Sequence, residues 1–299
     1  MNDDMRVVFE SGSPGACADR ALVLASLQIP HEIIADAGSC ALIVPARYSA
    51  QAAEQLMRYD AENPPPMPKR QPAIVYQNAL PGIFVYAIVV CLIAGLSARS
   101  WFALDWIAAG RIDGALMRAG EWWRTITALT LHAGLRHLVG NLIFGCLFGL
   151  FAGRLLGPGV AWLAILLAGV SGNLLNALLL EATHRSIGAS TAVFAALGLV
   201  AGFVWRGKLM AQDRWPYRVG PIVGGFALLM YTGTGGPNTD VGAHLMGFLS
   251  GLVAGTLLAP WRTRLLEPRW QIYAGTLAVL LVCLAWMLAL LGSNVALIM

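Results

Sequence analysis

The chain has 299 residues, of which 58% are hydrophobic and 12% are charged, and this is about half the charged fraction of an ordinary soluble domain. Most of it is therefore expected to lie in a lipid bilayer. The net charge of +4 is small and dispersed, which argues against a nucleic-acid-binding face. The odd number of cysteines and their spacing predict neither a disulfide framework nor a metal site, and no cofactor is expected. The cysteines are Cys17, Cys40, Cys91, Cys146 and Cys283.

Residues 1–61 are predicted to form a small soluble α/β domain. Strands are expected at residues 6–10, 32–35 and 41–44, and helices at residues 14–28 and 50–60. A βαββα unit of this length has a thin core. It contains neither a glycine-rich phosphate loop nor an acidic cluster, so we expect an accessory or regulatory cytoplasmic module. No basic region followed by an apolar one opens the chain, so no cleaved signal peptide is expected.

A proline-rich linker follows at residues 62–79, where consecutive prolines cannot continue a helix. Beyond it, apolar runs are spaced as membrane-spanning helices, which need about 20 residues each. Seven spans are expected, at residues 80–98, 129–152, 159–180, 187–205, 219–233, 240–259 and 271–293. The sequence thus predicts an all-α polytopic membrane protein, with a transmembrane core at residues 80–260 and a further C-terminal transmembrane helix within residues 261–299.

The connections between the spans indicate an orientation. Basic residues gather on one side, at residues 69–70, 154, 206–218 and 262–269. By the positive-inside rule this side is the cytoplasm, so the N-terminal domain is expected to be cytoplasmic and the C-terminus outside. The connection at residues 99–128 is rich in tryptophan, which predicts a loop lying in the outer membrane interface.

Polar side chains converge at one level of these spans, in the outer leaflet. His132, His137 and Asn141 lie in the first half of the expected second span, Ser190 begins the fourth, and His244 begins the sixth. Each of them taken singly could be a hydrogen bond between helices, worth about 1 kcal/mol. Together they point to chemistry, because polar residues inside a membrane are costly and usually face a cavity.

A serine hydroxyl needs an adjacent base in order to attack a carbonyl group, and His244 can serve Ser190 in that role. Gly247 and Gly251 share a helix face with His244 and permit close backbone approach, and Phe194 could hold the imidazole. Asp240 sits at the water boundary, so a Ser-His dyad is expected rather than a triad.

A tetrahedral intermediate also needs hydrogen-bond donors aimed at its oxyanion. The amides that open the fourth span have no partner within the helix and lie at the positive end of its dipole. Gly188 would let a substrate backbone come close. His137 and Asn141, four residues apart on one helix face, can point their side-chain donors into the same space. We therefore expect these three residues at the oxyanion hole.

Four motifs resemble the rhomboid family of intramembrane serine proteases. They are Trp123-Arg124, His132-x4-His137-x3-Asn141, Gly188-x-Ser190 and Ala243-His244-x2-Gly247-x3-Gly251. The resemblance implies a six-helix transmembrane bundle, to which some members add a seventh helix. It also implies that the protein cleaves single-span membrane proteins in or beside their transmembrane segment.

Carried over residue by residue, the resemblance makes Ser190 the nucleophile and His244 the general base and then acid. His137, Asn141 and the Ser190 amide would form the oxyanion hole. His132, Trp123 and Arg124 would be supporting residues. This chain has Thr191 where many members have glycine, and Phe194 where tyrosine is common; substrate preference and rate could differ for that reason.

Two other functions are open at this stage. A non-catalytic rhomboid-like protein could bind or escort transmembrane clients, although such a protein would be expected to lack the serine or the histidine. A transporter could also carry polar residues in its helices, but no inverted repeat is evident. The expected partners are transmembrane substrates and the lipid bilayer, and the expected location is the bacterial cytoplasmic (inner) membrane. Residues 232–240 form a glycine-rich loop that is expected to be mobile. The resemblance to the rhomboid family implies that this loop caps the site and that the fifth span could act as a side gate.

Overall fold

A computed structural model describes residues 4–36, 39–64, 75–179, 184–207, 215–233 and 239–296. The chain divides into two compact units, Met1–Gln71 and Pro72–Met299. Most of the expected proline-rich linker and most of the glycine-rich loop before His244 fall outside the described residues.

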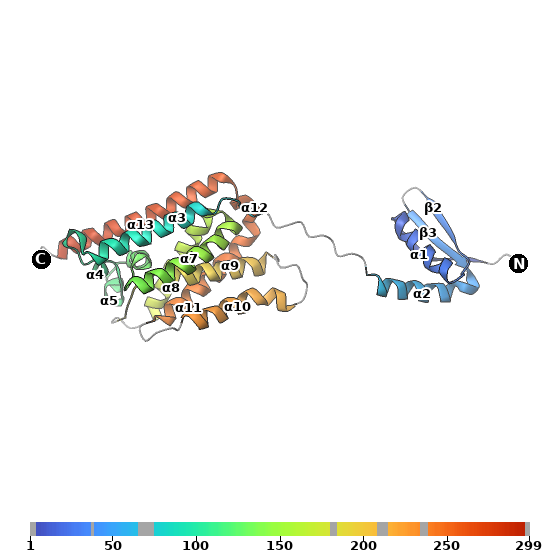
Figure 1. Ribbon diagram of the computed structural model, residues 1–299, viewed down its shortest axis with the longest axis horizontal. Helices are drawn as coiled ribbons and strands as arrows, with labels where there is room; N and C mark the ends of the chain where they lie inside the picture. Colours follow the sequence, from blue (N-terminus) through green and yellow to red (C-terminus); the bar gives the residue numbers. More distant parts are fainter. Residues whose placement is uncertain are drawn as a thin grey trace. The chain divides into compact units, whose positions relative to one another are not determined.

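The N-terminal unit is a three-stranded antiparallel sheet with helices on one face (Figure 1). Its elements are β1 (Met5–Ser11), α1 (Pro14–Ser26), β2 (Glu32–Asp36), β3 (Ser39–Pro45), a 3-10 turn η1 (Ala46–Tyr48) and α2 (Ser49–Glu62). The strand order is β1-β3-β2. Alternate residues of β3, Leu42 and Val44, pack with Leu24 of α1 and Leu56 of α2 to form a small core.

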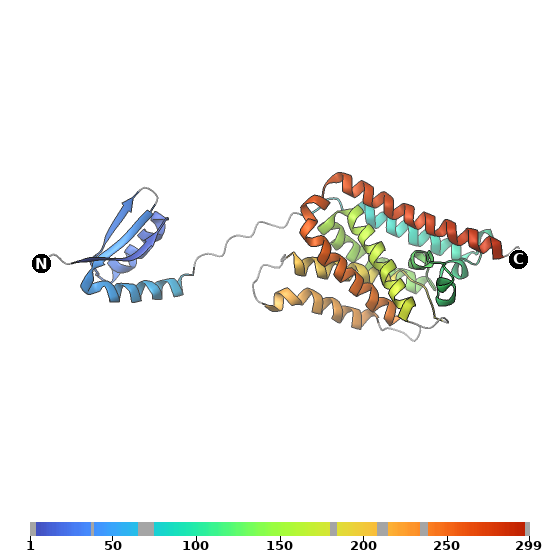
Figure 2. The ribbon, with the colours of Figure 1, turned by 180° about the vertical axis from the view of Figure 1, so that it is seen from behind.

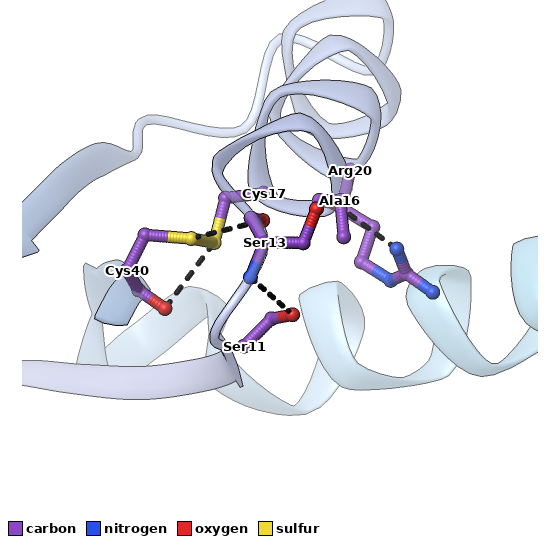
Figure 3. The surroundings of a disulfide bond; sticks show 6 residues. All are labelled: Ser11, Ser13, Ala16, Cys17, Arg20 and Cys40. Carbon is purple, nitrogen blue, oxygen red and sulfur yellow. Dashed lines mark hydrogen bonds between the residues drawn. A yellow bond between two sulfur atoms is a disulfide. The ribbon is translucent and has the colours of Figure 1, made fainter. Parts of the chain in front are cut away.

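The N-terminal unit contains a disulfide, which the sequence did not predict. Cys17 of α1 and Cys40 of β3 form a disulfide (Figure 3). Both residues are buried, at 0% and 2% exposure. The expectation of no disulfide was wrong because it rested on cysteine count and spacing. The fold, and not the spacing, brings two cysteines 23 residues apart into contact. Cys91, Cys146 and Cys283 are free thiols.

The second unit is helical throughout its core (Figure 1). Its main helices are α3 (Leu80–Ala98), α7 (Leu135–Leu156), α8 (Pro158–Leu179), α9 (Ser190–Arg206), α10 (Trp215–Gly233), α11 (Val241–Leu258) and α13 (Pro268–Ala296). Five helical segments of the described chain are long and apolar enough to cross a membrane: α3, α7, α8, the segment from Val241 to Leu265, and α13 up to Gly292. The protein is therefore an integral membrane protein.

Two of the seven expected spans are shorter apolar helices, α9 and the part of α10 between Val219 and Tyr231. Helix α9 has 17 residues, about 25 Å of helix, against a hydrocarbon thickness of about 30 Å. It begins at Ser190 instead of residue 187, because Gly188 adopts a φ of 141° that no α-helix contains.

The connection between α3 and α7 folds into short elements that displace the start of the second span. These are η2 (Trp101–Ala103), α4 (Trp106–Gly110), β4 (Ile112–Asp113), α5 (Gly114–Arg118), α6 (Arg124–Thr127) and η3 (Ala128–Thr130). Strand β4 pairs antiparallel with β5 (Arg185–Ser186), which leads toward Ser190. The second span begins only at Leu135, so His132 lies in the connection before the helix. The expectation that His132 lies inside the second span was wrong.

Helix α9 lies at the centre of the bundle, in contact with α7, α8, α10 and α11 (Figure 2). All its residues from Val193 to Leu199 are buried. After α11 the chain continues through η4 (Ala259–Trp261) and α12 (Arg262–Leu265) into α13. The buried Gln271 of α13 accepts hydrogen bonds from the Gly159 and Val160 amides at 2.9 and 3.2 Å, which fixes this last helix to the start of α8.

Candidate active site

Ser190 occupies the first residue of α9, and the preceding turn depends on glycine. Gly188 has a left-handed φ of 141°, and a Cβ there would lie 2.8 Å from Cε1 of His137. Among the residues that the structure describes, no side chain caps α9, whose first intrahelical bond runs from the Val193 amide to the Ala189 carbonyl at 2.9 Å. The amides of Ser190, Thr191 and Ala192 thus precede the first intrahelical bond, at the positive end of the helix dipole.

The Ser190 hydroxyl and the His244 imidazole are in direct contact. Nε2 of His244 lies 2.7 Å from Oγ of Ser190. His244 stands in the first turn of α11 and is buried, and its ring packs on Phe194 with centroids 4.6 Å apart. A neutral imidazole that accepts the hydroxyl proton at Nε2 carries its own proton at Nδ1.

Close packing of α9 against α11 makes this contact possible. A Cβ added at Gly247 would overlap the Thr191 carbonyl oxygen, and one at Gly251 would overlap the Ala195 carbonyl oxygen. The predicted approach of these two helix faces is therefore observed. Because both contacts are with backbone atoms, any side chain at either glycine would force the helices apart.

Two polar side chains of α7 face the same cavity, whose volume is about 1170 Å³ and whose lining includes Ser190 and His244. Asn141 is 6% exposed, and its Nδ2 has no hydrogen-bond partner among the described residues. Its backbone carbonyl accepts a hydrogen bond from Tyr86 at 2.9 Å. His137 accepts the Ala133 amide at Nδ1 over 3.4 Å, which leaves Nε2 to carry the proton of a neutral ring. Two donors are thus available beside the serine.

His132 packs against the His137 ring. It is buried beside His137, with ring centroids 5.3 Å apart, and neither of its nitrogens has a hydrogen-bond partner in the described part of the chain. Burial, together with the neighbouring His137 ring, lowers the pKa of His132 to about 4, so the ring is neutral at pH 7. Within the same described ranges, no group of three His, Cys, Asp or Glu side chains is placed to hold a metal ion.

Comparison with known proteins agrees with this geometry. A sequence model of the Rhomboid domain matches residues 119–261. The chain is 31% identical over 146 residues to the putative rhomboid protease YdcA of Bacillus subtilis, covering 48% of this chain and 71% of that protein. The chain belongs to the rhomboid family. It is also 27% identical over 195 residues to the rhomboid protease GluP of Bacillus subtilis, covering 64% of this chain but only 37% of GluP.

The rhomboid family also includes a relative whose name marks it as inactive. The chain is 31% identical over 141 residues to inactive rhomboid protein 1 of Drosophila melanogaster, which covers 46% of this chain and 9% of that protein. Family membership is therefore compatible both with protease activity and with its absence.

Two expected supporting residues of this rhomboid lie away from the dyad and do not line the cavity. The buried Arg124 donates from one guanidinium nitrogen to the carbonyls of Ala108 and Arg111, each at 2.9 Å, and from Nε to Glu121 at 2.6 Å. Trp123 precedes it at the start of α6. Arg124 thus holds together the folded connection between α3 and α7.

Asp240 was not expected to take part in the site, but in the structure it caps α11 and contacts two other segments. Its Oδ1 caps α11 by accepting the Ala243 amide at 2.9 Å, and its Oδ2 contacts Asn176 Nδ2 of α8 and His184 Nε2, each at 2.8 Å. Burial by itself raises the pKa of a carboxyl group, but the Ala243 amide and His184 outweigh it and hold the pKa of Asp240 below its usual range. An aspartate directly before an apolar helix is an N-cap signal that could have found it.

Proposed function

We propose that this rhomboid is an intramembrane serine endopeptidase of the bacterial cytoplasmic (inner) membrane. Its substrates would be single-span membrane proteins, cut in or beside their transmembrane segment by a Ser-His dyad. The observation that carries the proposal is the 2.7 Å contact between Ser190 Oγ and His244 Nε2 beside a large cavity. A relative that only binds transmembrane clients would need neither group.

In this mechanism the Ser190 oxygen attacks the carbonyl carbon of the scissile peptide while His244 takes the hydroxyl proton. His244 then returns the proton to the departing amine, which leaves an acyl ester on Ser190. Water, deprotonated by the same imidazole, attacks the ester and releases the second product. The dyad is thereby regenerated.

The negative charge of each tetrahedral intermediate would be met by donors already facing the cavity. We assign these to the side chains of Asn141 and His137 and to the backbone amide of Ser190, with Gly188 giving the substrate backbone room to approach. Such preorganised donors act in a water-poor site, where they are worth more than in bulk water. A substrate helix must first unwind around the scissile bond, because the carbonyl of a helical peptide group is hydrogen-bonded within the helix.

The test is cleavage of a single-span substrate by purified protein in liposomes, with the cut located by mass spectrometry. We expect Ser190→Ala and His244→Ala each to lower the rate by more than about 10³-fold while the protein stays folded. Ser171→Ala is the matched control, because Ser171 donates to the Leu167 carbonyl of its own helix at 2.9 Å and lines no part of the cavity.

A fluorophosphonate probe, which modifies nucleophilic serines, should label wild-type protein and leave Ser190→Ala unlabelled. Cleavage by Ser190→Ala at the wild-type rate would contradict the dyad. Wild-type protein that binds the substrate without cutting it and resists the probe would favour the client-binding alternative, which the inactive relative makes worth distinguishing.

A further inference from the structure

The last helix contacts the segment behind the proposed nucleophile. Trp286 of α13 is 6% exposed, and its indole Nε1 donates a hydrogen bond to Thr130 Oγ1 at 3.0 Å. Its ring packs on Trp106 with centroids 5.1 Å apart, and Gly110 faces it so closely that a Cβ there would lie 2.7 Å from the ring. Trp286 therefore contacts the folded connection between α3 and α7 at three of its residues.

From Thr130 the contacts continue toward Ser190. The Thr130 hydroxyl donates its single proton to the Thr127 carbonyl at 2.8 Å, so the indole N–H satisfies its acceptor side and the hydroxyl closes the η3 turn. Within that turn, the Ala128 carbonyl accepts the amide of Gly188 at 3.0 Å. Gly188 is two residues before Ser190 and has the left-handed φ that sets the path of the chain into α9.

We propose that Trp286 is a positioning residue for Ser190, acting through Thr130, the η3 turn and the Gly188 amide; this inference rests on the proposed protease function. Trp286 lies beyond residues 119–261, which match the Rhomboid domain, so nothing in that match assigns it a role. It does not line the cavity and would not touch substrate. The seventh helix would then be part of the catalytic scaffold.

The physical reason is the sensitivity of catalysis to placement, since a shift of about 1 Å at a reacting group can cost 10²-fold in rate. Without the indole donor, the Thr130 hydroxyl can rotate and the η3 turn loosens. The Gly188 amide then loses its fixed acceptor, and Ser190 spends less time facing His244. Substrate binding is untouched, so the loss belongs to kcat and not to KM.

The test compares Trp286→Phe, which keeps an aromatic ring but removes the N–H, with Thr130→Val, which keeps the side-chain shape but removes the hydroxyl. We expect each to lower kcat by about 10-fold with KM nearly unchanged, in line with a displacement smaller than 1 Å. The double variant should lose little more than either single one, because both remove the same link. The control is Trp270→Phe, an exposed tryptophan at the other end of α13.

A second readout does not depend on activity. Hydrogen exchange at residues 186–189 should be faster in Trp286→Phe and Thr130→Val than in wild type, and unchanged in Trp270→Phe. If wild-type protein neither cleaves nor reacts with the fluorophosphonate probe, the protease function has failed, yet this exchange still decides whether Trp286 positions the Ser190 turn. Should Trp286→Phe fail to fold, Thr130→Val carries the same test.

Three results would overturn the inference. The first is a folded Trp286→Phe with wild-type kcat and wild-type exchange at residues 186–189. The second is a loss that appears in KM alone, which would place Trp286 in substrate binding. The third is a double variant whose loss is the product of the two single losses, because independent effects multiply and a shared link does not.

Discussion

The side-chain amide of Asn141 is an unusual group for a protein interior. A buried N–H without a partner costs about 1–3 kcal/mol, yet Asn141 Nδ2 has none among the described residues. Its backbone is held by Tyr86 from α3, and its side chain lines the cavity with Ser190. Because no group of the described residues holds this donor, an oxyanion in the cavity could accept from it without first displacing a protein partner.

We therefore predict that Asn141→Ala lowers kcat about 10²-fold while KM changes little, since one oxyanion donor is lost. The measurement is steady-state cleavage in liposomes. The contrast is Asn173→Ala, because Asn173 already donates to the Thr125 carbonyl at 2.9 Å. This substitution should lower the free energy of unfolding, while kcat should change less than in Asn141→Ala. Wild-type kcat in Asn141→Ala would remove this residue from the oxyanion hole.

How far the site could be predicted is clear from particular residues. Alternation of the spans was enough to bring Ser190, His137, Asn141 and His244 to one level, because it depends only on the length and polarity of apolar runs. The place of His132 was wrong, since nothing in the apolar pattern distinguishes a helix from the turns of η3 that precede it. Asp240 was set aside because its partners, Asn176 and His184, come from distant segments that only the fold brings together.

At the scale of helices, glycines set the distance between the two halves of the dyad. The spacing of Gly247 and Gly251 predicts a close crossing, but the sequence cannot say which atoms meet there. In the structure they are carbonyl oxygens of α9. Backbone atoms cannot rotate away as a side chain does, so this crossing has almost no tolerance for added volume.

Gly251→Ala should accordingly lower the free energy of unfolding by about 1–3 kcal/mol, as overpacking does, and should also lower kcat by separating His244 from Ser190. Gly95→Ala is the matched control, because a Cβ at Gly95 of α3 meets nothing within 4 Å. That substitution should be neutral or stabilising by up to about 1 kcal/mol. Equal effects of the two substitutions in unfolding and cleavage assays would contradict the role given to the α9–α11 crossing.

For the whole molecule, the disulfide of the N-terminal unit and the expected orientation point to different compartments. The positive-inside rule predicts that this unit lies in the cytoplasm, whereas disulfides persist mainly in oxidising compartments. Each sulfur also lies near a carbonyl oxygen to which a reduced thiol could donate, Cys17 Sγ at 3.2 Å from the Cys40 oxygen and Cys40 Sγ at 3.4 Å from the Ser13 oxygen (Figure 3). A reduced pair would therefore have hydrogen-bond partners, so the disulfide matters for the stability of the unit more than for its fold.

Reduction should lower the free energy of unfolding of the N-terminal unit by about 3 kcal/mol, the chain-entropy value for a closed loop of this size. Hydrogen exchange along β3 in the full-length protein, with and without reductant, measures this directly. Exchange in α9 is the internal reference, because the cysteines of the helical unit are free thiols. In Cys17→Ala the reductant should have no effect. If reduction leaves β3 exchange unchanged in the wild type, the core around Leu42 and Val44 stabilises the unit without the cross-link. The unit would then be equally stable in a reducing cytoplasm.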